Sequence, residues 1–178
     1  MSSKKIPLSH HKKKYKNINF SLIIVSDTRS QQFQTGDTPQ DLTSPLVGKI
    51  LLKSNYILQN KFIVPDDKDE ILQILSSLID KSDIDIILTS GGTGISPRDQ
   101  TLETIQPLFD KEIMGFGEIF RYMSFEEIGS AAMLSRATAG IIKSKIIFVL
   151  PGNPNAVELA LNKLIIPEID HMLNMIGK

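Results

Sequence analysis

The sequence predicts a single α/β domain built on a mainly parallel sheet. Short, continuous runs of β-branched and other apolar residues alternate with segments of helical periodicity, which is the order typical of strand–helix–strand proteins. The runs lack polar alternation, as expected of strands covered by helices on both faces. With 178 residues, 41% of them hydrophobic and 22% charged, the chain is long enough to bury one such core.

Strands and helices alternate in the first half of the chain. The polar stretch 27–43 reads as a long loop, and Pro45 opens a predicted helix that reaches Ser54, because proline is tolerated in a first turn. A second helix is predicted over 68–81, where the apolar residues have helical spacing. Parallel strands joined in this way are connected by right-handed crossovers. The three predicted strands cover residues 20–26, 56–64 and 84–89.

The second half continues the pattern with less regular spacing. Helices are predicted over 102–108 and 114–125, and nearby glycines blur their boundaries. Two apolar runs, 139–142 and 146–150, are separated by three polar residues and predict a hairpin or a closely spaced pair of strands. The last helix is predicted over 155–166, and the proline that follows should break or kink it.

The composition excludes several kinds of chemistry. The chain has no cysteine, which removes disulfides, thiolate metal sites and thiol nucleophiles. Its three histidines are His10 and His11, near the N-terminus, and His171, near the other end. This distribution argues against a Ser-His-Asp triad and against a multi-histidine metal site. Catalysis must therefore use carboxylates, hydroxyls, basic side chains, backbone N–H groups or a hard cation with oxygen ligands.

The charges are unevenly distributed although the formal net charge is zero. Six lysines precede the first acidic residue, Asp27, and the rest of the chain carries 14 basic against 20 acidic residues. We therefore expect a basic, disordered arm over 1–17 and one domain over 18–178. Tyr15 is the only aromatic residue in the arm, so we do not expect nucleic-acid binding. No run approaches the ~20 apolar residues of a membrane span, so we expect a cytoplasmic protein without membrane contact.

Three loops are expected at the carboxyl edge of the sheet, where open parallel sheets bind their ligands. They follow Val64, Thr89 and Leu150. Glycines in the second loop allow backbone N–H groups to converge on an anion such as phosphate, because no Cβ blocks the approach. The loop is neither a P-loop nor a dinucleotide fingerprint, so a tight turn without a ligand is the alternative. Its central residues are Gly91, Gly92, Thr93 and Gly94.

Two carboxylates are expected beside this glycine loop. Asp66 follows the strand that ends at Val64, and Asp99 follows the glycine loop itself. Each could serve only as a cap for the helix that begins after it. Both should lie at the same edge of the sheet, however, and Mg²⁺ is held by one or two carboxylates together with substrate phosphates. We therefore favour a magnesium site over two helix caps.

Two further segments are candidates for anion contact. Asn153 is a good N-cap and Pro154 suits a first helical position, so the free N–H groups of the last helix, with Gly152 before them, would point at the same edge. Ser135 and Arg136 lie in a predicted turn. One interpretation is that both are ordinary surface residues. The other is that the guanidinium of Arg136 binds a phosphate or a planar polar ring.

In this order, the loops resemble the molybdenum cofactor biosynthesis family that includes MoaB and Mog. The resemblance covers nearly everything after the basic arm, and its long central segment is more similar to the MoaB branch than to Mog. The matching segments are Val25-Ser26-Asp27, Pro65-Asp66, TSGGTGISPRDQT (89–101), GFGEIFRYMSFEEIGSAAMLSRATAG (115–140) and LPGNPNAV (150–157).

The resemblance implies a three-layer α/β/α sandwich with a mainly parallel central sheet. It also implies that ATP adenylylates molybdopterin in the presence of Mg²⁺, giving adenylyl-molybdopterin and pyrophosphate before metal insertion. The family's two essential aspartates fall on Asp66 and Asp99, which would be catalytic and bind the metal, and its pterin-contacting serine falls on Ser135. The other residues implied in substrate binding are Ser26, Asp27, Gly91, Gly92, Thr93, Gly94, Arg136, Gly152, Asn153 and Pro154.

The same resemblance implies a homotrimer or homohexamer that passes its product to a molybdate-inserting protein. One departure concerns the first helix after the long loop, where the family carries an acidic residue followed by Ser-Gly. This chain has Ser44 in the glycine position. Glycine and serine differ in the backbone conformations and in the ligand approach that they allow. A second hypothesis is therefore a protein of this fold that binds molybdopterin without adenylylating it.

Overall fold

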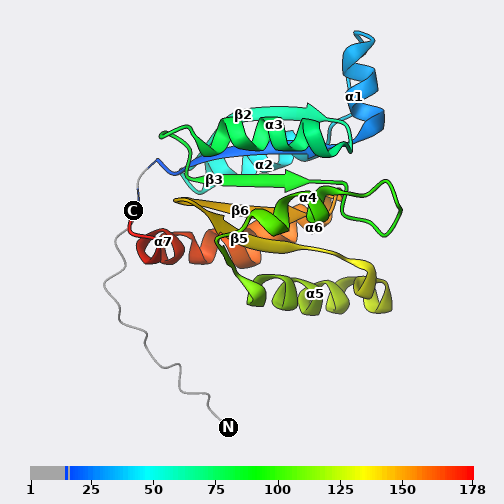
Figure 1. The fold of residues 1–178 in the computed structure, drawn as a ribbon. Coiled ribbons are helices and arrows are strands. Elements are labelled where there is room, and N and C mark those ends of the chain that lie inside the picture. Colours follow the sequence, from blue (N-terminus) through cyan, green and yellow to red (C-terminus); the bar gives the residue numbers. More distant parts are fainter. Residues whose placement is uncertain (1–14, 16) are drawn as a thin grey trace.

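A computed structural model describes Tyr15 and residues 17–178, so the predicted basic arm lies almost entirely outside the described residues (Figure 1). The strands are β1 (Asn19–Val25), β2 (Ile57–Val64), β3 (Ile86–Ser90), β4 (Lys111–Glu112), β5 (Thr138–Ile142) and β6 (Lys145–Leu150). Within the described part they form a six-stranded sheet in the order β2-β1-β3-β6-β5-β4. Neighbours from β2 to β6 pair in parallel, whereas β5 pairs antiparallel with both β6 and β4. The predicted hairpin is therefore β5–β6, and the sheet is mainly parallel as expected.

Helices cover both faces of the sheet, which confirms the three-layer prediction (Figure 1). They are α2 (Thr43–Lys53), α3 (Lys68–Ile79), α4 (Thr101–Ile105), α5 (Met114–Ile128), α6 (Pro154–Ala160) and α7 (Ile166–Met175). One core cluster packs α2, α5, α6 and α7 against the strand residues that include Ile24. The other packs α3 and α4 against the opposite face, which includes Ile23. The strands are apolar on both sides because both sides are covered.

The structure corrects the long loop predicted over 27–43. A helix, α1 (Asp27–Gln34), occupies its first part and projects from the carboxyl edge of the sheet (Figure 1). Of its side chains only Ser30 is buried, so the helix has no apolar periodicity to reveal it. The remaining local signals are the N-cap Ser26, whose Oγ accepts from the Arg29 N–H at 3.4 Å, and the acidic residue in its first turn.

The end of the chain is also more helical than predicted. After α6 the backbone passes through a π-helical turn, η3 (Leu161–Ile165), and continues directly into α7. Pro167 follows the π-helical turn directly, so the irregular turn lies where the proline withdraws an N–H from the continuous helical segment. The helical segment therefore reaches Met175 instead of ending before the proline. None of the helices in the described part of the chain has the length and apolar character needed to span a bilayer.

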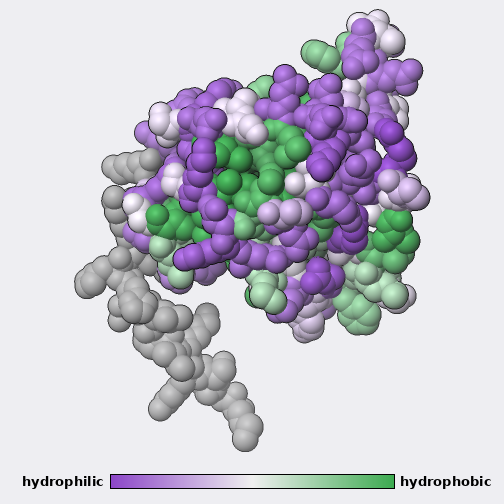
Figure 2. All heavy atoms as spheres, viewed as in Figure 1, coloured by the Kyte–Doolittle hydropathy of each residue, from purple (hydrophilic) through white to green (hydrophobic). Residues whose placement is uncertain are grey.

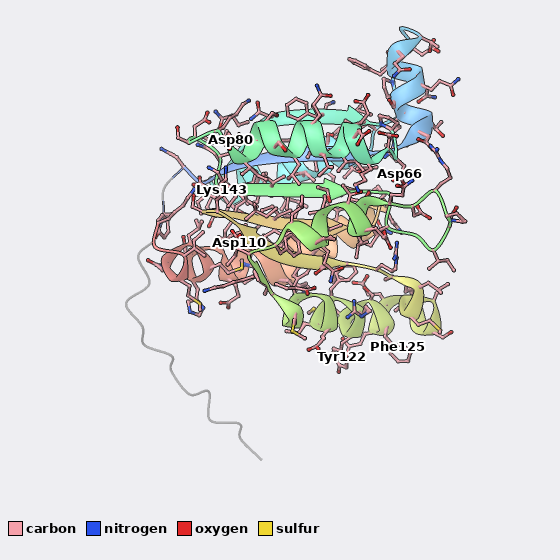
Figure 3. All side chains as sticks on the ribbon, in the orientation of Figure 1. Asp66, Asp80, Asp110, Tyr122, Phe125 and Lys143 are labelled. Carbon is pink, nitrogen blue, oxygen red and sulfur yellow. The ribbon has the colours of Figure 1, made fainter. Side chains whose placement is uncertain are left out.

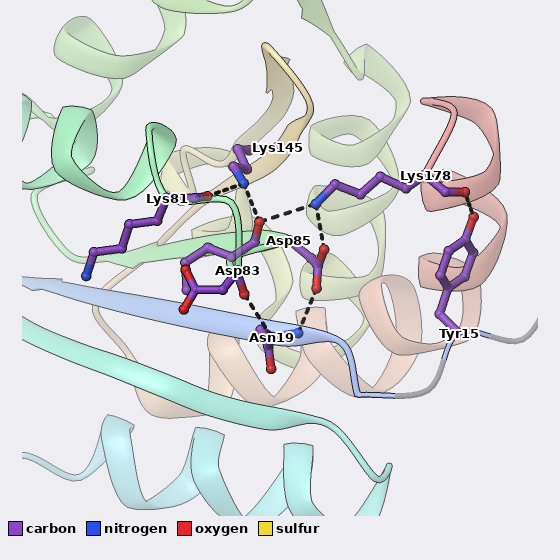
Figure 4. Close-up of polar contacts among 8 residues, drawn as sticks. Tyr15, Asn19, Lys81, Asp83, Asp85, Lys145 and Lys178 are labelled. Atoms are coloured by element: carbon purple, nitrogen blue, oxygen red, sulfur yellow. Dashed lines mark hydrogen bonds and ion pairs between the residues drawn. The ribbon is translucent and has the colours of Figure 1, made fainter.

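A buried lysine lies at the end of the sheet that is opposite to the carboxyl ends of the parallel strands (Figure 4). Lys145 is only 3% exposed, and its Nζ donates to the carbonyl oxygens of Lys81 and Ile84, both at 2.5 Å. Lys178 Nζ donates to the same Ile84 oxygen at 3.2 Å and pairs with Asp85 Oδ1 at 2.5 Å. Burial, and then the charge of Lys178, lower the pKa of Lys145. This cluster stabilises the edge of the sheet that lies away from the predicted ligand loops.

Candidate functional site

A cavity of about 680 Å³ opens at the carboxyl edge of the sheet, and its size suits a small-molecule ligand. Its walls come from the ends of β1, β3 and β6, from α1, and from the short helix η2 (Gly129–Leu134) with the turn after it. It is lined by Val25, Ser26, Thr28, Arg29, Gln32, Gln40, Gly91, Gly92, Thr93, Gly94, Asp99, Ala131, Leu134, Ser135, Arg136, Pro151 and Gly152.

The structure brings most of the predicted site residues to this cavity. The exceptions are Asp27, Asp66, Asn153 and Pro154, which do not line it. The α1 side chains at the cavity, and Gln40 after them, were not predicted as site residues, because this polar stretch has the composition of a loop. The cap at the start of α1 was the signal that could have placed Thr28, Arg29 and Gln32 on one helix facing the site.

Gly91 is required by its contact with the backbone of β1. Its φ is +112°, and a Cβ at this position would lie 2.0 Å from the carbonyl oxygen of Val25. Gly152 packs against Gly91, since a Cβ added to Gly152 would lie 3.3 Å from the Cα of Gly91. The ends of β1, β3 and β6 therefore meet backbone against backbone, and this contact explains both glycines independently of any bound anion.

The two other glycines of the loop make room for the two candidate catalytic carboxylates. A Cβ on Gly92 would lie 2.6 Å from Oδ2 of Asp66 and 2.2 Å from Oγ1 of Thr101. A Cβ on Gly94 would lie 2.6 Å from Oδ2 of Asp99. Each glycine thus faces one aspartate, and a side chain at either position would collide with the carboxylate that it faces.

Neither aspartate is the helix cap that was the alternative. The N-cap of α3 is Asp67, whose Oδ1 accepts from the backbone N–H groups of Asp69 at 3.0 Å and Glu70 at 3.2 Å. The N-cap residue of α4 is Gln100, which makes no side-chain cap bond. Asp99 instead closes a tight turn, in which its Oδ2 accepts from the Ser96 N–H at 2.9 Å.

Asp66 is a buried carboxylate, 7% exposed, behind the glycine loop and at the end of the sheet opposite to Asp80 (Figure 3). Its Oδ1 accepts from the Gln100 N–H at 3.1 Å. Burial and the nearby negative charges of Asp99 and Asp27 raise the pKa of Asp66, against the effect of this hydrogen bond. The ionised carboxylate therefore sits in a field that favours a positive ligand.

Asp27 lies beside the cavity with both carboxylate oxygens occupied. Oδ1 accepts from the Asp66 N–H at 2.9 Å, and Oδ2 accepts from Nη2 of Arg98 at 2.6 Å. The hydrogen bond from Arg98, followed by that from the Asp66 N–H, lowers the pKa of Asp27. Asp27 is therefore ionised and engaged with two other loops of the edge.

Arg136 lines the cavity with its guanidinium partly neutralised. Nε donates to the Thr93 carbonyl oxygen at 2.9 Å, and Nη1 and Nη2 donate to the carboxylate of Glu103 at 2.5 and 3.3 Å. This side chain joins the glycine loop to α4. Arg136 and Ser135 also line an adjoining cavity of about 580 Å³ on the side of α5, so the two cavities meet at these residues.

The start of α6 has the predicted local structure. Asn153 is its N-cap and accepts from the Asn155 N–H at 3.0 Å, and Pro154 occupies the first turn. Ser44, at the family's glycine position, is buried, and its N–H donates to Oδ1 of Asp41 at 3.0 Å. Ser44 does not line the cavity.

Comparison with known proteins gives the family. Residues 21–171 match the family described as a probable molybdopterin binding domain. The chain is 43% identical over 164 residues to molybdenum cofactor biosynthesis protein B of Bacillus cereus, with 92% of this chain and 93% of that protein covered. The chain belongs to the MoaB/Mog family of molybdopterin-binding domains.

Solved structures of MoaB proteins have the same fold. A crystal structure of a molybdenum cofactor biosynthesis protein B superposes with a TM-score of 0.83 at 41% identity, covering 92% of this chain and 98% of that one. The tungsten cofactor synthesizing protein MoaB from Pyrococcus furiosus superposes with a TM-score of 0.78 at 42% identity, covering 93% and 100%. The resemblance inferred from the loops and the three-layer fold are both confirmed.

Proposed function

We propose that this chain acts in molybdenum cofactor biosynthesis by adenylylating molybdopterin with ATP. The observation that carries the proposal is the glycine loop that lines the cavity, in which Gly92 faces the buried Asp66 behind the loop and Gly94 faces Asp99 at the cavity. A loop of this kind brings backbone N–H groups and two carboxylates to one place, which is what the alignment of two polyphosphate groups around a cation requires. We accordingly propose Asp66 and Asp99 as catalytic, and the cavity residues as the substrate site.

The proximity of the two carboxylates supports a magnesium ion at this place, because the charge of Asp99 is close enough to raise the pKa of Asp66. No group of three or more acidic or histidine side chains that could hold a metal gathers in the described part of the chain, so protein ligands alone would not complete an octahedral shell. Mg²⁺ commonly takes one or two carboxylates and completes its shell with water and substrate phosphates. We propose that Asp66 and Asp99 hold Mg²⁺ together with ATP, and that the ion supplies charge neutralisation for the leaving pyrophosphate.

The proposed reaction needs no strong base from the protein. An oxygen of the terminal phosphate of molybdopterin bonds to the α-phosphorus of ATP, and the bond from that phosphorus to the α–β bridging oxygen breaks, releasing pyrophosphate. The nucleophilic oxygen is already ionised, so the chain has to orient the two anions and hold them together. The backbone N–H groups of the glycine loop would hold phosphate oxygens, while the pairing of Arg136 with Thr93 and Glu103 keeps this loop in place.

The test is a reconstituted assay with purified protein, molybdopterin, ATP and Mg²⁺. We expect pyrophosphate and adenylylated pterin, and we expect Asp99→Asn to raise the barrier by at least ~3 kcal/mol, roughly a hundredfold loss of rate. Asp80→Asn removes an exposed aspartate at the far end of the sheet and is the matched control (Figure 3). An unchanged rate in Asp99→Asn would reject the metal role, and pterin binding without turnover would favour the non-catalytic alternative.

We also propose that the protein self-associates through α5, as a trimer or hexamer. Ile119, Tyr122, Phe125 and Ile128 are between 51% and 63% exposed at three-residue intervals on this helix. Tyr122 and Phe125 project from its outer side (Figure 3), and hydrophobic residues lie at the edge of the molecule near this helix (Figure 2). Several exposed apolar side chains on one helix are typical of an interface between subunits. Light scattering should give an oligomer that Phe125→Glu dissociates.

The remaining partner expectations follow from the reaction. A product that still lacks its metal requires hand-over to a molybdate-inserting protein. The supply of ATP favours the cytoplasm. Pull-down of a molybdate-inserting protein by the oligomer, with the Asp99→Asn variant as a product-free control, would test the hand-over.

A further inference from the structure

We propose that Asp27 and Arg98 form a positioning pair that sets the separation between the carboxylates of Asp66 and Asp99. The inference rests on the proposed function, because it assigns these two residues to the geometry of that site. From the family resemblance, Asp27 is expected among the substrate contacts. In the structure its carboxylate is directed instead at two other loops of the same edge.

The first link of the pair is to the loop after β2. Asp27 Oδ1 accepts the N–H of Asp66 itself, at 2.9 Å, so the backbone that carries one candidate catalytic carboxylate is anchored directly. One residue before Asp27, the Ser26 N–H donates to the Val64 carbonyl oxygen at 2.8 Å. Two hydrogen bonds therefore join the start of α1 to the loop that carries Asp66.

The second link is to the turn that carries the other carboxylate. Arg98 Nη2 donates to Asp27 Oδ2 at 2.6 Å, and Arg98 immediately precedes Asp99. The turn is closed on itself by the Ser96–Asp99 hydrogen bonds, so a shift of Arg98 displaces the carboxylate of Asp99 with it. The residues of this loop from Gly94 to Arg98 are exposed, so burial does little to hold them in place.

The Asp27–Arg98 ion pair is exposed to solvent, which allows an effect on the site geometry to be measured apart from an effect on stability. The Arg98 and Asp27 side chains are 66% and 47% exposed, and ion pairs this exposed contribute little to global stability. A displacement of about 1 Å at a reacting group, by contrast, can lower a rate by about a hundredfold. The pair should therefore affect the site far more than it affects unfolding.

The experiment compares Asp27→Asn, Arg98→Gln, Arg98→Lys and the double variant Asp27→Asn/Arg98→Gln. Asparagine keeps an oxygen for the Asp66 N–H but removes the charge that Arg98 requires. We expect each of the two disruptive single variants to lower kcat by about 10- to 100-fold with little change in KM for ATP. The double variant should be no slower than the slower single one, because both act through one contact. Arg98→Lys should recover part of the rate.

A second readout does not depend on turnover. Binding of Mn²⁺ in the presence of a non-hydrolysable ATP analogue should weaken several-fold in the disruptive variants, while their urea unfolding midpoints stay unchanged. Lys143→Gln breaks an ion pair of similar length, Lys143 Nζ to Asp80 Oδ1 at 2.7 Å, at the opposite edge and is the matched control. It should leave kcat and Mn²⁺ binding as in the unmodified protein.

The outcomes separate this inference from the proposed function. Absence of adenylylation by the unmodified protein, with Mn²⁺ binding that the pair still controls, would reject the function and support the positioning role. Unchanged Mn²⁺ affinity and kcat in Asp27→Asn and Arg98→Gln would overturn the inference. So would additive losses in the double variant, or a loss of unfolding free energy large enough to explain the loss of activity.

Discussion

Replacement of Gly92 by alanine should damage both stability and activity, for a reason that is visible in the loop. Gly92 has φ +61°, and an added Cβ would lie 2.6 and 2.8 Å from the two carboxylate oxygens of Asp66. It would also lie 2.2 Å from Oγ1 of Thr101, which is fully buried. Ordinary carbon–oxygen contact begins near 3.4 Å, so the carboxylate would have to retreat by about 1 Å.

Two costs add in this variant. A non-glycine residue in the left-handed region costs about 1–2 kcal/mol, and an added group in a packed site costs about 1–3 kcal/mol. We therefore expect Gly92→Ala to lose about 2–5 kcal/mol of unfolding free energy. Gly36→Ala is the matched control, since Gly36 has φ +82° and no atom within 4 Å of its would-be Cβ. It should lose about 1–2 kcal/mol, which is the conformational cost alone.

Urea unfolding of the two variants measures the difference, and the adenylylation assay measures its consequence. Retreat of the Asp66 carboxylate by about 1 Å should lower the rate by about a hundredfold, whereas Gly36→Ala should keep most of it. Equal losses of unfolding free energy in the two variants would show that Gly92 is needed only for its φ. Full activity in a folded Gly92→Ala protein would refute the argument that the loop positions Asp66.

Three further predictions concern single side chains. In Gly94→Ala the added Cβ would lie 2.6 Å from Asp99 Oδ2, so the adenylylation rate should fall by about tenfold or more. The loss of unfolding free energy should be small, because Asp99 is only half-buried. Gly115→Ala, whose Cβ would have no atom within 4 Å, is the control. Burial raises the pKa of Asp66, so its ionised form destabilises the folded state; in the presence of a chelator, Asp66→Asn should therefore raise the unfolding free energy at pH 7 while abolishing activity. This gain should shrink as the pH falls through the raised pKa and vanish below about 4, where the carboxyl group is protonated in both states. A gain that grew instead would contradict the assigned direction. Lys145→Met withdraws the donor from the carbonyl oxygens of Lys81 and Ile84 and should lose about 1–3 kcal/mol in urea unfolding, while an unchanged midpoint would mean that water replaces the ammonium group without cost.

Local sequence patterns predicted the elements that carry an apolar face. The five predicted strands and the helix α3 are confirmed, because the central strands are continuous apolar runs buried on both faces and the buried residues of α3 follow the helical period. The two-residue strand β4 has no such run and was not predicted. The helix α1 was missed for the converse reason, since its only buried side chain is Ser30. The sequence leaves the role of Asp66 undecided, because the first residue of α3 cannot be predicted to within one residue. In the structure Asp67 is the N-cap of α3, so the carboxylate of Asp66 is not used as a cap.

The sequence by itself determined the order of the strands and helices that carry apolar faces, the three loops at the carboxyl edge and the residue types available there. The tertiary structure alone decided which of these residues meet. Asp27 contacts Asp66 and Arg98 across 39 and 71 residues of sequence, and Gly92 and Gly94 each face an aspartate of the same edge. Such contacts depend on the strand order β2-β1-β3 and on the register between strands, and both result from the packing of the whole sheet. Local periodicity specifies which face of an element is buried, but it carries no information about the neighbour on that face.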